Sequence, residues 1–157
     1  MEFALVASLL FLLLFAIVGY GLAFYRSVTV ADATRAAARV GVIGATPCQM
    51  YGYVLSLVDN TSLTVDFTFP GNVTCSITNG SDSCTSSTIT GVYAEAGFLT
   101  VQVDDPVTSP VPLVGLGSSY TITQSTTMMM ENSSNGPVPN VPEPSSWSSG
   151  IPSWCTP

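Results

Sequence analysis

The chain has 157 residues, of which 46% are hydrophobic and only 8% are charged, whereas soluble domains usually carry about 25% charged residues. It contains neither histidine nor lysine, and its formal net charge at pH 7 is -7. Beyond residue 39 it has carboxylates and no cation. This composition excludes nucleic-acid binding, which needs a basic surface, and catalysis that depends on a histidine or lysine base.

The N-terminal segment is apolar and uncharged. Residues 3–25 contain no charge, and at about 1.5 Å per residue a helix of this length is about 34 Å long, enough to cross a bilayer core of about 30 Å. Helix-forming residues continue to residue 40, and Pro47 then stops the pattern. The sequence predicts one helix of about 40 residues, with an apolar first half and an amphipathic second half. The residues at helical spacing in its second half are Val28, Ala31, Arg35 and Ala38.

The direction in which this segment crosses a membrane is predicted differently by two signals. The three arginines, at positions 26, 35 and 39, favour a cytoplasmic C-terminal part. Four cysteines and four N-x-S/T sequons favour an exported, oxidised domain. A basic leader removed from in front of Met1 would reconcile the two, and we expect the chain to be the mature exported form. The candidate glycosylation sites are Asn60, Asn72, Asn79 and Asn132.

Glu2 stands directly before the apolar run. A carboxylate that enters hydrocarbon needs a partner. One interpretation places it among lipid headgroups or at the positive end of the helix. The other pairs it with an α-amino group, its own or that of a neighbouring subunit in a bundle of such helices.

The N-terminus resembles a known family. The opening Met-Glu-Phe-Ala-Leu-Val at residues 1–6, the leucine-rich run after it and the Ala/Arg-rich residues 31–39 are similar to TadE-like proteins. These are pseudopilins or minor pilins of the tight-adherence branch of the type IV pilus superfamily. Residues 97–106 and 120–131 look like the closing strands of the family, so the resemblance extends to residue 131. Where the family usually has Glu and Arg, this chain has Gly19 and Leu22.

The resemblance implies a structural pilin of an extracellular tight-adherence pilus, serving adhesion. Its stem would span the cytoplasmic membrane, with the C-terminal domain outside, and would later form the filament core with identical subunits. The assembly machinery and the membrane are the other implied partners. A minor pseudopilin that primes or caps a pilus of another subunit is the alternative. The residues expected to carry assembly are Met1, Glu2, Phe3, Leu5, Leu9, Leu12 and Phe15.

The body after Pro47 is predicted to be β-rich. A short helix follows Pro47, although a strand is the alternative, and apolar residues then alternate with polar ones as in half-buried strands. Asn79-Gly80 is a hairpin signal. We predict an α+β fold in which the second half of the stem packs on an antiparallel sheet of about four or five strands. The expected parts are a stem at 1–46, a β-rich domain at 47–131 and a tail at 132–157; the expected strands are 63–69, 73–77, 98–103 and 120–129.

The four cysteines indicate disulfides. Cys75 and Cys84 flank the Asn79-Gly80 turn, so a hairpin brings them within disulfide distance. This leaves Cys48 with Cys155, although four cysteines allow three connectivities. A zinc site is the alternative, but the chain has no C-x-x-C pair and no histidine. We therefore expect no metal and no cofactor.

The tail at 132–157 is rich in proline and serine, which favours an extended chain. A disordered linker is one interpretation. Because Trp147, Trp154 and Cys155 are unusual in a solvated coil, we expect the tail to lie across the sheet or a neighbouring subunit.

No catalytic constellation is recognisable, and we expect no enzyme. Asp104-Asp105-Pro106 indicates a turn more than a cation site, and Met128–Met130 indicates a half-buried strand. A monomeric anchored module that binds a ligand through its tryptophans is a third hypothesis for the function.

Overall fold

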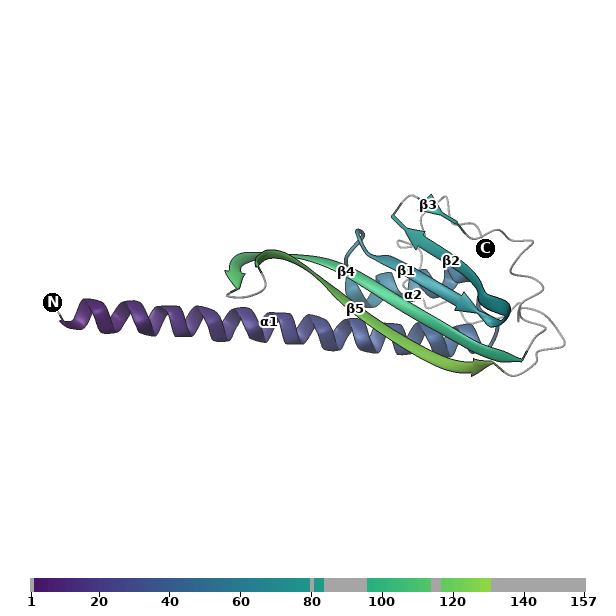
Figure 1. Ribbon diagram of the computed structural model, residues 1–157, viewed down its shortest axis with the longest axis horizontal. Helices are drawn as coiled ribbons and strands as arrows, with labels where there is room; N and C mark the ends of the chain where they lie inside the picture. Colours follow the sequence, from purple (N-terminus) through teal and green to yellow (C-terminus); the bar gives the residue numbers. More distant parts are fainter. Residues whose placement is uncertain (1, 80, 84–95, 114–116, 131–157) are drawn as a thin grey trace.

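The computed structural model describes residues 2–79, 81–83, 96–113 and 117–130. It has the predicted α+β fold: a long helix, α1 (Glu2–Val42), whose second half carries a small domain (Figure 1). The domain contains helix α2 (Pro47–Val58), a short 3-10 turn η1 (Pro70–Asn72) and one antiparallel sheet. The strands are β1 (Thr64–Phe69), β2 (Val73–Thr78), β3 (Ser81–Asp82), β4 (Gly97–Leu113) and β5 (Gly117–Met130).

The connection between the two helices is built from local capping. After Val42 the chain turns at Gly44, whose φ of 100° suits a residue without a side chain, and its N–H donates to the Gly41 carbonyl at 3.0 Å. Thr46 and Gln49 then form a capping box, in which each side chain accepts a hydrogen bond from the other residue's backbone N–H. Pro47 occupies the first turn of α2, where its missing N–H has no consequence. The prediction of a helix after Pro47 is confirmed.

The sheet has the strand order β3-β2-β1-β4-β5, with every neighbouring pair antiparallel. The Asn79-Gly80 signal agrees with the pairing of Thr78 with Ser81 between β2 and β3; Gly80 itself lies outside the described residues. Strands β4 and β5 pair from Gly97 opposite Met130 to Leu113 opposite Gly117, with one register shift. Both run well beyond the predicted ranges 98–103 and 120–129.

The turn predicted at Asp104-Asp105-Pro106 is wrong, because these residues lie inside β4. The pairing of β1 with β4 ends where Thr64 meets Asp104. Pro106 therefore follows the last pair, on an edge where its missing N–H removes no hydrogen bond to β1. It stays in the hairpin opposite Thr121 of β5.

The second half of α1 packs on β4 and β5, as predicted. The helical spacing noted in the sequence does not define the packed face, because Val28 is 60% exposed and Arg35 is also exposed. Small side chains occupy that face, so the helix axis lies close to the sheet. The buried Thr34 hydroxyl donates to the Val30 carbonyl at 2.7 Å, which satisfies its hydrogen bond inside the helix. The fully buried members of this face are Val30, Ala33, Thr34, Ala37 and Ala38.

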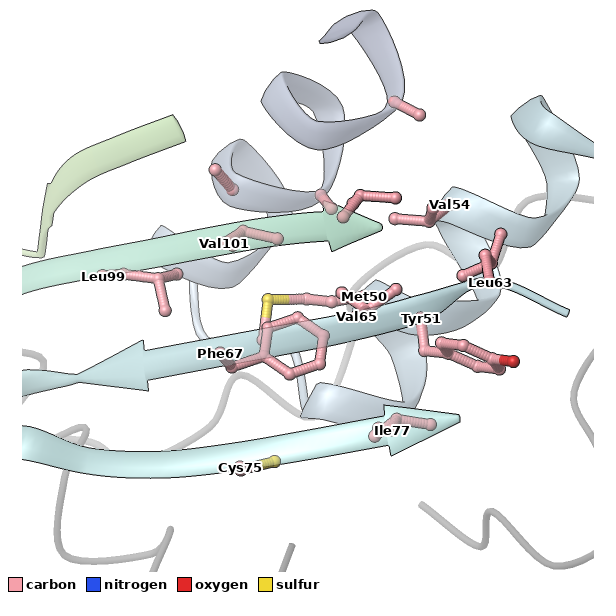
Figure 2. Packing of buried hydrophobic residues seen from close by; sticks show 14 of the residues in the cluster. Met50, Tyr51, Val54, Leu63, Val65, Phe67, Cys75, Ile77, Leu99 and Val101 are labelled. Carbon is pink, nitrogen blue, oxygen red and sulfur yellow. The ribbon is translucent and has the colours of Figure 1, made fainter. Parts of the chain in front are cut away.

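The core lies between the helices and one face of the sheet. Met50 and Tyr51 of α2 meet Phe67 of β1, and Leu99 of β4 lies alongside (Figure 2). The alternation predicted for the first strand is confirmed, since its apolar side chains at 63, 65, 67 and 69 are all buried. Gly41 of α1 belongs to the same layer: a Cβ there would lie 2.5 Å from Leu99 Cδ2 and closer still to Met50 Sδ. Glycine thus permits the close approach of α1.

The three methionines at the end of β5 behave as predicted for a half-buried strand: Met130 is buried, Met128 is partly buried and Met129 is exposed. The predictions made for the tail at 132–157, including the packing of Trp147 and Trp154, fall outside the described residues.

Candidate assembly surface

The first half of α1 is an apolar helix exposed on most of its circumference. Leu9 is 68% exposed, and the leucines, phenylalanines, isoleucine and valines around it are exposed to a similar degree. Among the described helices, α1 is the one whose length and composition, over Val6–Val42, suit a membrane crossing. The large exposed apolar residues of this half are Val6, Leu9, Leu10, Phe11, Leu12, Leu13, Leu14, Phe15, Ile17, Val18, Leu22 and Phe24.

The helix itself is stabilised locally. The run contains leucine, alanine and phenylalanine without proline, so each backbone N–H can donate to the carbonyl four residues earlier. Phe11 and Phe15, one turn apart, stack with ring centroids 6.5 Å apart. This surface is far larger than the isolated apolar patches of soluble monomers, which indicates that it is covered in the functional state.

A narrow stripe of small residues interrupts the exposed surface. Ala16, Ala23 and Ser27 are half-buried and Gly19 is buried, at intervals of three and four residues, so they share one face of the helix. The stripe continues into the packed face described above. At Ser27 the hydroxyl accepts a hydrogen bond from Gln124 Nε2 of β5 at 3.4 Å. One face of α1 thus meets its own domain, and the other faces present large apolar side chains.

The predicted assembly residues fall on this helix. Leu9, Leu12 and Phe15 are exposed. The backbone of Glu2, Phe3 and Leu5 is part of α1, whereas Met1 lies outside the described residues. Their role in assembly stays a prediction.

The cations lie beyond the apolar half. Arg26, Arg35 and Arg39 are all exposed, and Arg35 Nη1 is 3.3 Å from Asp32 Oδ1, one turn earlier. Since both side chains are mostly solvated, this pair contributes little to stability. The apolar half therefore ends at Arg26, the first charged residue after Glu2, and the half that follows has exposed cations on one side and a buried face on the other.

The four sequons differ in environment. Asn72 and Asn79 are exposed, and Asn132 lies outside the described residues. Asn60 is partly buried, and its amide is fully engaged: Nδ2 donates to Asp105 Oδ1 and, at 3.3 Å, to the Pro106 carbonyl. Its Oδ1 accepts from the Ser62 N–H at 3.1 Å.

Asp105 is the most unusual polar residue of the domain. It is 0% exposed, and its Oδ2 atom has no hydrogen-bond partner among the described residues. Sequence reasoning missed its link to Asn60, because the two residues lie 45 positions apart. The described part of the chain contains no group of three or more His, Cys, Asp or Glu side chains that could hold a metal ion.

Two of the predicted disulfide residues are described. Cys48, in the first turn of α2, and Cys75, in β2, are both buried and disulfide-bonded. Cys84 and Cys155 lie outside the described residues, so the pairing of Cys75 with Cys84 and of Cys48 with Cys155 stays a prediction.

Comparison with known families bears on this surface. The model of the TadE-like protein family matches residues 1–39. The match covers the apolar half of α1 and the whole Ala/Arg-rich segment at 31–39, and it confirms the resemblance there. Similarity beyond residue 39 stays a prediction. No curated protein and no solved structure matches the chain. The TadE-like stem and the exposed apolar helix together fit a pilin related to tight-adherence pili.

Proposed function

We propose that this chain is a structural subunit of an extracellular tight-adherence pilus, assembled by bundling of the apolar halves of α1. The observation that carries the proposal is the exposed apolar surface from Val6 to Phe24, which the chain's own domain leaves mostly uncovered. The match to the TadE-like family over the same helix supports it.

The same surface suits two environments in succession. Before assembly, lipid chains cover it while α1 spans the membrane with the domain outside. After assembly, identical helices cover it, since apolar helices pack on one another through van der Waals contact as well as on lipid. When each copy is related to the next by a rotation and a translation, the copies do not form a closed ring and instead generate a helical filament. The pilus assembly machinery moves the subunit from one environment to the other.

Glu2 has a specific role in this scheme. A carboxylate taken into an apolar bundle is strongly destabilising unless it is paired. We propose that it pairs with the α-amino group of a neighbouring subunit. The stem at 1–46 then forms the filament core, the domain at 47–131 the filament surface, and the tail at 132–157 an additional surface layer. In the exported domain, the paired cysteines stabilise the fold, and the exposed sequons at Asn72 and Asn79 are available for glycans that would coat the filament.

Electron microscopy of sheared surface material, with mass spectrometry of its subunits, tests the proposal. We expect filaments made mostly of this chain, and we expect Glu2→Ala to abolish them while the subunit remains folded in the membrane. Asp32→Ala is the matched control, because Asp32 is a solvated carboxylate on the same helix. Normal filaments from Glu2→Ala would remove the proposed role of Glu2.

The composition of the filaments separates the alternatives. Filaments made mostly of another subunit, with this chain as a trace component, would identify a minor pseudopilin that primes or caps assembly. The family match supports that role equally well, because it covers only the stem. Absence of any filament would favour the third hypothesis, a monomeric anchored module that binds a ligand.

A further inference from the structure

Strands β4 and β5 extend beyond the rest of the sheet. The pairing of β1 with β4 ends at Asp104, whereas β4 and β5 remain paired as far as Leu113 and Gly117. The extension forms a two-stranded hairpin that follows α1 toward its N-terminus, past the other strands (Figure 1). We call residues 109–113 with 117–118 the hairpin end.

The hairpin reaches the apolar half of α1. The contact between Gln124 and Ser27 fixes one point along the helix. From there to Gly117 the strand is about 23 Å long at about 3.3 Å per residue, whereas the helix from Ser27 to Gly19 rises only about 12 Å. Gly19 is buried, but Gly21, on another face, has nothing within 4 Å of an added Cβ. Since α1 contacts β4 and β5, and the hairpin lies alongside the helix in Figure 1, we attribute the burial of Gly19 to the hairpin.

The part of α1 that precedes Gly19 is too short to span a bilayer alone. From Glu2 to Val18 the helix is about 26 Å long, whereas the hydrocarbon core is about 30 Å thick and its headgroup layers add several Å on each side. When α1 spans the membrane, the hairpin end therefore enters the interfacial layer on the side of the domain.

Side chains at this level suit that layer. Tyr20 and Tyr25 of α1 are exposed, and Tyr120 of β5 is half-buried. Tyrosine is enriched at the membrane–water interface, where its ring lies in the apolar region and its hydroxyl in the polar one. Arg26, the next residue of α1, suits contact with phosphate groups.

The composition of the hairpin end suits contact with lipid. After Asp105 the chain has no charged residue until Glu131. Residues 109–113 read Ser-Pro-Val-Pro-Leu. Between Thr108 and Leu113 the regular pairing of β4 with β5 is interrupted, and the two prolines there have no backbone N–H that would need a hydrogen-bond partner. An unpaired backbone N–H is destabilising in a lipid environment, and proline has none.

We propose that the hairpin end is a lipid-contacting element that lies in the interfacial layer of a phospholipid bilayer while α1 spans it. The membrane-spanning α1 is the first point of attachment and the hairpin end is the second. Together they fix the tilt of the domain against the membrane before assembly. The inference rests on the membrane-spanning stage of the proposed function.

A photoreactive residue introduced at Leu113 tests this in the full-length, oxidised protein. The protein is reconstituted into vesicles of phosphatidylcholine and phosphatidylglycerol, irradiated and examined by mass spectrometry for lipid adducts. Matched variants carry the same residue at Leu12, in the apolar half of α1, and at Phe98, exposed at the opposite end of β4. Circular dichroism confirms that each variant is folded.

We expect lipid adducts at Leu113 and Leu12 and no lipid adduct at Phe98. An adduct at Leu12 without one at Leu113, or a Leu113 label that reacts only with α1, would overturn the hairpin proposal and leave the membrane-spanning stem intact. Absence of adducts at both Leu12 and Leu113 would refute the hairpin proposal and also the membrane stage of the proposed function. Equal adducts at Leu113 and Phe98 would indicate a domain lying flat on the membrane, which also contradicts the proposal.

Discussion

The substitution Asn60→Ala tests whether one amide stabilises the buried carboxylate of Asp105. The Asn60 side chain joins the end of α2 to β4 through Asp105 and the Pro106 carbonyl, and it accepts the Ser62 N–H. Asp105 is 0% exposed. Its Oδ1 accepts from Asn60 and its Oδ2 has no hydrogen-bond partner among the described residues. Removal of the amide leaves a buried carboxyl group without a side-chain hydrogen-bond partner among the described residues.

The expected loss follows from these bonds. A buried acceptor left without its partner destabilises the fold by about 1–3 kcal/mol, and loss of a neutral hydrogen bond by about 1 kcal/mol. The Ser62 N–H is exposed and regains a water, so its bond adds little. We expect Asn60→Ala to lower the free energy of unfolding by about 3 kcal/mol. In an Asp105→Val background the loss falls to about 1 kcal/mol, because an apolar side chain between Val103 and Val107 needs no partner.

The measurement is guanidinium unfolding of the full-length protein in detergent micelles, with disulfides intact, followed by near-UV circular dichroism. Ser62→Ala is the matched control: it removes the sequon at Asn60 but keeps the backbone N–H that the amide accepts. It should change stability by less than about 0.5 kcal/mol. An equal loss from Asn60→Ala in both backgrounds would refute the coupling to Asp105. A loss from Ser62→Ala as large as that from Asn60→Ala would attribute the effect to a glycan.

Three further predictions follow from single positions. Gly41→Ala should destabilise the domain by about 1–3 kcal/mol in the same unfolding assay, because the added Cβ overlaps two core side chains, whereas Gly21→Ala, in open space, should not destabilise it. Burial raises the pKa of Tyr51, so the folded state favours its neutral form. Stability should therefore fall as pH rises from about 10 through the raised pKa. A pH series of unfolding curves should lack this part of the alkaline loss in Tyr51→Phe. Glycopeptide mapping of exported protein should find Asn72 modified in preference to Asn60, whose two Nδ2 hydrogens are both donated; a fully occupied Asn60 would contradict this.

The strongest features of the fold could be predicted because their signals are local. The uncharged run before Arg26 predicts α1, and the alternation from Leu63 to Phe69 predicts a strand with one buried face. Proline at the start of α2, after a threonine, is a local start signal as well. These signals depend on residues a few positions apart, so a single sequence contains them in full.

The errors concern long-range structure. Asp104-Asp105-Pro106 has the composition of a turn, but β5 and the segment after α2 provide partners that keep it extended: Pro106 pairs with Thr121, and Asp105 receives a hydrogen bond from Asn60. The sequence also did not show that the β4–β5 hairpin follows α1. The available signal was the long uncharged stretch after Asp105, which is unusual for a strand pair exposed to water.

Two demands on one helix explain the division of α1 into a small-residue stripe and a large apolar surface. The small residues from Ala16 to Ser27 are half-buried or buried, while leucine and phenylalanine on the other faces remain available to lipid or to other copies. This accounts for one departure from the TadE-like pattern, in which a glutamate usually occupies the position of Gly19. Because Gly19 is buried, a carboxylate there would be desolvated, which is destabilising unless the charge is paired. On the inference that the hairpin covers Gly19, the glycine at this position and the long uncharged hairpin are parts of the same arrangement.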